Sequence, residues 1–111
     1  MTSKIFNAVW SDALNAADRD AFVSDWALSS IWPDTPEGDT LIDHAEQCGR
    51  VWDLAHMSVA DIRHAAGLTQ AAFAERFCIP LRTLQNWEMR GGCAPYIRLM
   101  FARLCKLADG L

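Results

Sequence analysis

The residues most able to do chemistry lie between positions 81 and 86. Gln85 and Asn86 follow Arg82 by three and four positions, so a helix would place all three on one side. In the major groove of DNA, arginine forms paired hydrogen bonds with guanine, and glutamine and asparagine form them with adenine. Leu81 extends this face and could contact a thymine methyl group. The pattern predicts the reading of base edges, and the alternative is an ordinary solvated polar face.

Two short helices joined by a tight link are needed to position these side chains. Thr69 is a residue type that caps a helix N-terminus, and small and apolar residues follow it. Pro80 is tolerated at or next to the first position of a second helix, which we expect to continue through Glu88. Leu84 and Trp87 should face inward, away from the polar side chains. This is the layout of a helix-turn-helix.

Three sequence motifs carry a likeness to a known family. Residues 67–70 read Gly-Leu-Thr-Gln, residues 73–74 read Phe-Ala, and residues 83–88 read Thr-Leu-Gln-Asn-Trp-Glu. In these motifs the chain resembles the lambda-repressor-like helix-turn-helix family of the xenobiotic-response-element type, over about residues 58–105. The resemblance implies a compact bundle of short helices, in which the second helix of the pair enters the major groove.

The resemblance also implies roles for single residues. Thr69 and Gln70 would lie at a helix N-terminus that docks on a phosphate, and Arg90 would follow the recognition helix as a phosphate contact. Arg63 and Glu88 would form a structural ion pair. The residues that would reach base edges are Leu81, Arg82, Gln85 and Asn86.

The chain departs from the family pattern at two places. Cys78 stands in the link where the family usually has glycine, so we expect a less common turn there. The loop after the recognition helix is usually richer in basic residues in the family, whereas here residues 89–94 contain one basic residue, Arg90. Phosphate binding should therefore be weaker than in the family or draw on other arginines. The candidates for that role are Arg63, Arg82 and Arg98.

Charge is distributed unevenly along the chain. The whole sequence has a net charge of −4. Residues 1–60 hold three basic and ten acidic residues, a net charge of −7, whereas residues 61–111 hold seven basic and four acidic residues, a net charge of +3. The C-terminal half is therefore suited to meet phosphates, and the N-terminal half to face solvent, a basic partner or both.

The N-terminal region, residues 1–57, is predicted to form about three packed helices. Apolar residues recur at helical spacing over about residues 3–16 and 18–31, and Asp18 is suited to cap the second of these helices. Residues 32–36 contain two prolines and should end it.

A third helix, at about residues 40–56, carries an apolar stripe that needs a partner. The stripe consists of Leu41, Ala45, Cys48, Trp52 and Ala55. The simplest partner is the core of the chain itself. The alternative is a dimer seam, formed by this stripe or by exposed tryptophans at positions 10, 26 and 32.

The C-terminal domain, residues 58–111, should hold the helix-turn-helix within an all-α bundle. Ser58 and Asp61 have the spacing of a capping box at its first helix. Pro95 marks the start of a last helix, whose apolar face should close the core. That face comprises Ile97, Met100, Phe101, Leu104, Cys105 and Leu107.

Catalytic and metal chemistry find little support in the sequence. His44 and Cys48 are four positions apart on a helix, but no second ligand pair is evident, and the cysteines lack Cys-x-x-Cys spacing. We expect reduced thiols, no metal, no cofactor and no enzyme activity, because no phosphate-binding glycine loop or activated nucleophile is recognisable. Without a bilayer-spanning apolar run or a signal-peptide core, a cytoplasmic protein with no membrane contact is expected.

The predicted function is sequence-specific binding of double-stranded DNA by a small transcriptional regulator, a repressor that occupies its operator. A palindromic operator would require a homodimer, since two recognition helices must then match one half-site spacing. The alternative is an antitoxin or a mobile-element inhibitor, whose acidic N-terminal half binds a basic protein partner. These two roles can coexist in one chain.

Overall fold

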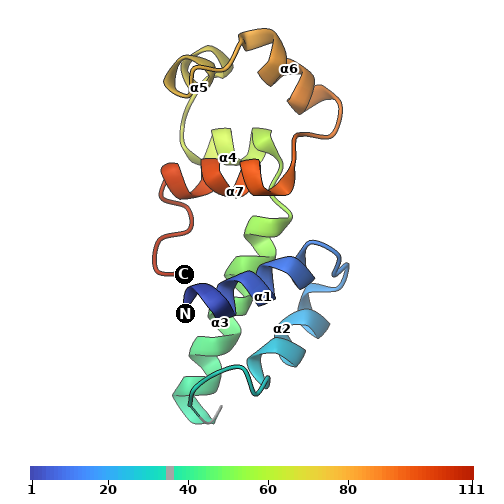
Figure 1. The fold of residues 1–111 in the computed structure, drawn as a ribbon, viewed down its shortest axis with the longest axis vertical. Helices are drawn as coiled ribbons and strands as arrows, with labels where there is room; N and C mark the ends of the chain where they lie inside the picture. Colours follow the sequence, from blue (N-terminus) through green and yellow to red (C-terminus); the bar gives the residue numbers. More distant parts are fainter. Residues whose placement is uncertain (35–36) are drawn as a thin grey trace. The chain divides into compact units, whose positions relative to one another are not determined.

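A computed structural model describes residues 1–34 and 37–111, and within these ranges the chain forms seven α-helices and no strand (Figure 1). The predicted all-α class is confirmed. The chain divides into two compact units. The first comprises residues 1–56 and 110–111, and the second comprises residues 57–109.

The first unit is a three-helix bundle. Its helices are α1 (Ser3–Ala13), α2 (Arg19–Ala27) and α3 (Gly38–Ala55). Both α1 and α2 pack against α3. Asp18 caps α2 as predicted, because its carboxylate accepts a hydrogen bond from the N–H of Ala21 at 3.2 Å. Helices α1 and α2 end earlier than expected, and residues 35–36 of the predicted break lie outside the described residues.

The buried side of α3 differs from the predicted stripe. Val51 and Leu54 are buried although neither belongs to that stripe, whereas Leu41 and Ala45 are only partly buried. Because α3 packs against two helices, its buried surface is wider than a single row of residues. Cys48 is fully buried at the centre of this surface.

Two of the three tryptophans predicted as exposed candidates for a dimer seam are buried, and the third, Trp26, is partly buried. Trp10 and Trp32 are only 7% and 8% exposed, so this expectation is wrong for both. The Trp32 indole N–H donates to the carbonyl of Trp26 at 2.9 Å, and the Trp26 indole N–H donates to Asp12 at 2.8 Å. Because the indole N–H of the buried Trp32 has this acceptor, its ring can serve as part of the core.

The second unit contains four shorter helices. They are α4 (Val59–Ala65), α5 (Gln70–Arg76), α6 (Leu81–Met89) and α7 (Pro95–Leu104). Figure 1 shows α4 beside α7, and α4 also contacts α6, which packs on α5. The predicted capping box is present, because the Ser58 hydroxyl accepts from the Asp61 N–H at 3.0 Å and the Asp61 carboxylate accepts from the Ser58 N–H at 2.9 Å.

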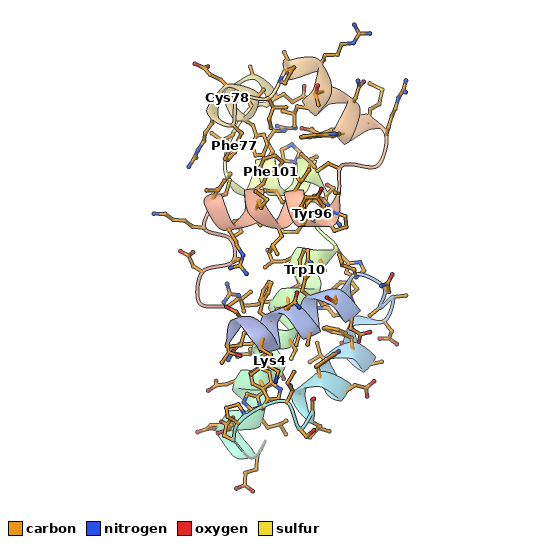
Figure 2. The ribbon with its side chains drawn as sticks, viewed as in Figure 1. Lys4, Trp10, Phe77, Cys78, Tyr96 and Phe101 are labelled. Carbon is orange, nitrogen blue, oxygen red and sulfur yellow. The ribbon has the colours of Figure 1, made fainter. Side chains whose placement is uncertain are left out.

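Aromatic rings form the core of the second unit. Phe73 is fully buried, and its ring centroid lies 4.7 Å from that of Phe77 and 5.2 Å from that of Phe101. Phe77 and Phe101 lie side by side with centroids 5.1 Å apart (Figure 2). Two residues of the predicted apolar face of α7, Met100 and Leu104, are instead 57% exposed, because the helix turns Phe101 and Ala102 inward.

Candidate nucleic-acid interface

Helix α6 is anchored by one side and exposed on the other. Pro80 precedes it as the N-cap residue, and its missing N–H is no loss at a helix start. Leu84 is fully buried and Trp87 is partly buried, with the Trp87 ring centroid 6.1 Å from that of Phe101. These apolar anchors fix which face of α6 points away from the core.

The outward face of α6 carries the predicted base-reading residues. Arg82, Gln85 and Asn86 are all exposed, and Leu81 is 42% exposed. Within the part of the chain that the structure describes, the side chains of these three polar residues have no hydrogen bond or ion pair. Their donors and acceptors are consequently available to an external partner. We call Leu81, Arg82, Gln85 and Asn86 the α6 face.

One exposed residue of α6 was missed at the sequence level. Met89 is 77% exposed and lies four positions after Gln85 and three after Asn86. This spacing places it on the side of the helix that carries those two residues, and the same rule that grouped the polar residues could have identified it. Met89 adds a flexible apolar contact at the C-terminal end of the α6 face.

Arg63 and Glu88 join α4 to α6 through a bidentate ion pair. The Arg63 Nε donates to Glu88 Oε2 at 2.9 Å, and its Nη2 donates to Oε1 at 2.8 Å. The side chains are only 12% and 10% exposed. A third Arg63 nitrogen, Nη1, donates to the carbonyl of Leu68 at 3.0 Å. This arrangement fixes the end of α6 against the bundle.

The ion pair also sets the charge state of its members. The hydrogen bonds from Arg63 hold the pKa of Glu88 below its usual range, against the opposing effect of burial. The same hydrogen bonds raise the pKa of Arg63. Glu88 is therefore ionised at neutral pH, and Arg63 compensates its charge next to the α6 face.

Thr69 and Gln70, predicted as phosphate contacts, lie at the start of α5. The Thr69 hydroxyl caps this helix by accepting from the N–H of Ala72 at 3.1 Å, which confirms the predicted cap. The Gln70 amide donates to Glu88 Oε1 at 3.3 Å. Gln70, Gln85, Glu88 and Met89 together line a shallow depression, so the structure brings α5 and the end of α6 together.

The link between α5 and α6 turns sharply at Cys78. This residue has φ = +53°, in the left-handed region that glycine adopts most easily. The N–H of Cys78 donates to the carbonyl of Glu75, and the N–H of Ile79 donates to that of Ala74 at 2.9 Å. The side chain of Cys78 is exposed (Figure 2). Cys78 thus occupies a backbone conformation in which glycine would be unstrained.

The arginines proposed to supplement phosphate binding are not equally available. Arg63 is held by Glu88, and Arg98 donates from Nη1 to the carbonyl of Met57 at 2.5 Å. Arg82 and Arg90, in contrast, are exposed, and neither side chain has a hydrogen bond or ion pair among the described residues. Of these four arginines, the two that can reach a phosphate without breaking an internal hydrogen bond or ion pair therefore lie on α6 and directly after it.

The other candidate residues, His44 and Cys48, lie in the first unit, where they pack within the bundle. His44 stacks on Trp32 with ring centroids 3.8 Å apart, and its Nε2 lies 3.2 Å from Asp34 Oδ1. Burial raises the pKa of the Cys48 thiol to about 11. Among residues 1–34 and 37–111, no group of three or more His, Cys, Asp or Glu side chains is placed to hold a metal ion.

All four cysteines are free thiols, with Cys48 buried and Cys78 exposed. No helix in the described ranges is long and apolar enough to cross a bilayer. Comparison with protein-family models, with curated proteins and with solved structures found no match to this chain.

Proposed function

We propose that the chain is a sequence-specific double-stranded DNA-binding protein that inserts α6 into the major groove. The main support is the α6 face, where an arginine, a glutamine and an asparagine are exposed and have no internal hydrogen bonds. These are the side-chain types that read guanine and adenine edges bidentately. A polar face that only contacts solvent would not require these three side-chain types together on the side of α6 that points away from the core.

Electrostatics of the second unit favour a polyanionic ligand. Residues 57–109 hold seven basic and four acidic residues, a net charge of +3, although the whole chain is acidic. Of the acidic side chains, Glu88 lies closest in sequence to the α6 face, and Arg63 compensates it. Phosphates approaching α6 therefore meet Arg82 and Arg90 without a bare carboxylate at the end of the helix.

We propose further that the protein acts as a small transcriptional regulator of the lambda-repressor-like type and represses by occupying an operator. One α6 reads only a few base pairs, so a palindromic operator read by a homodimer would supply the specificity that regulation needs. The mode of binding rests on the residues of α6, whereas repression rests on the resemblance in residues 67–88.

A salt series tests whether the second unit contacts phosphates. Binding of the full chain to a mixed-sequence duplex is measured from about 50 mM to 200 mM salt, where phosphate contacts give a steep loss of affinity. Arg90→Ala should lower the slope of log K against log salt by about 1. Lys4→Ala is the matched control, because it removes one positive charge from an exposed position on α1. Equal slopes for wild type and Arg90→Ala would refute the placement of Arg90.

A further inference from the structure

The first unit has an apolar groove that the proposed DNA binding does not use. It runs between α2 and α3, and five of its six lining residues are apolar. The lining residues are Val23, Ser24, Ala27, Leu28, Leu41 and Ala45. We call this the α2–α3 groove. Leu28 is 62% exposed, and Ile42, three positions before the lining residue Ala45 on α3, is 57% exposed. Large apolar side chains therefore extend from the groove onto the surface.

Acidic residues lie one helical turn from Ser24 on α2 and from Ile42 on α3. On α2, Asp20 lies four positions before Ser24, which places the two on one side of that helix. On α3, Asp39 lies three positions before Ile42 and Glu46 lies four positions after it. All three carboxylates are exposed. The apolar lining of the groove is therefore accompanied by exposed carboxylates about one helical turn away on both α2 and α3.

The rest of the first unit does little to offset this charge. Residues 1–56 and 110–111 hold ten acidic and three basic residues, a net charge of −7. One of the basic residues, Arg19, is committed to Asp53 through two hydrogen bonds of 2.9 and 3.1 Å, and these raise its pKa. The field at the groove is accordingly negative, which attracts cationic ligands and repels anionic ones.

We infer that the α2–α3 groove binds a basic amphipathic helix of a partner protein. A groove between two helices accepts apolar residues spaced three and four apart on a third helix, and the exposed carboxylates on α2 and α3 favour Lys or Arg on the flanks of that helix. A second copy of the same unit is a poor occupant, because both surfaces carry the same strong negative charge. This site lies on the first unit and is independent of DNA reading by α6.

Designed peptides provide the probe. One short helical peptide carries leucines three and four positions apart with lysines elsewhere, a second has glutamates in place of the lysines, and a third has serines in place of the leucines. Binding to the full chain is measured by fluorescence anisotropy of the labelled peptides. The leucine–lysine peptide should bind at least about tenfold more tightly than either of the others, since each lacks one of the two required features. Equal binding of all three, or no binding of the first, would overturn the inference.

Variants then locate the site on the protein. Leu28→Ser and Ile42→Ser should each weaken binding of the leucine–lysine peptide severalfold or more, while leaving the helical content unchanged because both side chains are already exposed. Leu104→Ser is the matched control, since Leu104 lies on α7 of the second unit and has the same 57% exposure as Ile42. An equal effect of Leu104→Ser would contradict the assignment. A shift from dimer to monomer on Ile42→Ser, seen by sedimentation, would show that a second copy is the occupant and would also overturn it.

Discussion

Replacing Arg63 with methionine should destabilise the second unit by about 2–3 kcal/mol. The change removes two charge-assisted hydrogen bonds to Glu88, of 2.9 and 2.8 Å, and a third to the carbonyl of Leu68. Within the described residues it leaves the Glu88 carboxylate the Gln70 amide as a hydrogen-bond donor at 3.3 Å and the electrostatic effect of His64. Methionine fills part of the same volume, so the loss is mainly electrostatic.

The magnitude follows from how well water reaches the pair. Breaking a fully buried ion pair by removing one partner costs about 3–5 kcal/mol, because an uncompensated charge stays in the interior. Here the side chains of Arg63 and Glu88 are 12% and 10% exposed, so solvent recovers part of that cost. The expected loss therefore falls at or just below the lower end of the range. With a urea m-value of about 1 kcal/mol/M for a small domain, the midpoint of unfolding should fall by about 2–3 M.

A double-mutant cycle isolates the pair from other effects. Arg63→Met, Glu88→Leu and the double variant are compared by native-state amide hydrogen exchange at Phe73 and Leu84, which are fully buried in the second unit. The double variant should be more stable than the sum of the single losses predicts, because no unpaired charge remains. Single losses below about 0.5 kcal/mol that add without coupling would refute the reasoning.

Three further outcomes are expected. Gln85→Ala or Asn86→Ala should weaken binding to a cognate duplex by about 1–3 kcal/mol but leave binding to a scrambled duplex unchanged, as measured by anisotropy; equal losses on both duplexes would contradict base reading. Cys78→Gly should raise the free energy of unfolding by about 0.5–1 kcal/mol in urea titration, because relief of the left-handed conformation at φ = +53° exceeds the entropic cost of glycine; a loss of stability would contradict this. Wild type should be more stable than Glu88→Gln, and this difference should be complete above about pH 5. It should vanish as the pH falls through the folded-state pKa of Glu88, because Arg63 lowers that pKa below the unfolded value of about 4.3. A stability difference that persists at low pH would show that the charge of Glu88 does not cause it.

Local signals predicted the helix starts well. Asp18, Ser58 and Thr69 each cap the helix that follows, and Pro95 occupies the first turn of α7. Caps act over about three residues, so the sequence alone contains what decides them. The inward face of α6 could also be predicted from local sequence, because Leu84 belongs to its apolar pattern. The burial of Leu84 leaves the polar side of the helix facing outward.

The spacing of residues along the sequence did not predict how the helices pack against one another. Trp32 is buried and stacks on His44, which lies on α3, twelve positions further along the chain. Met100 is 57% exposed although it belongs to the predicted apolar face of α7. At the candidate site, the hydrogen bond from Gln70 to Glu88 joins residues 18 positions apart. Such contacts depend on how α5 and α6 meet in space, and a helical period does not specify that.

Parallel selection of bound duplexes from a random pool, with wild type and with Arg82→Ala, tests the central claim most directly. Wild type should enrich one motif, and Arg82→Ala should enrich the same motif with relaxed preference at one base pair of each half-site, because the arginine that reads it is gone. Failure of folded wild-type protein to enrich any motif, or an identical motif from both proteins, would contradict DNA reading by the α6 face.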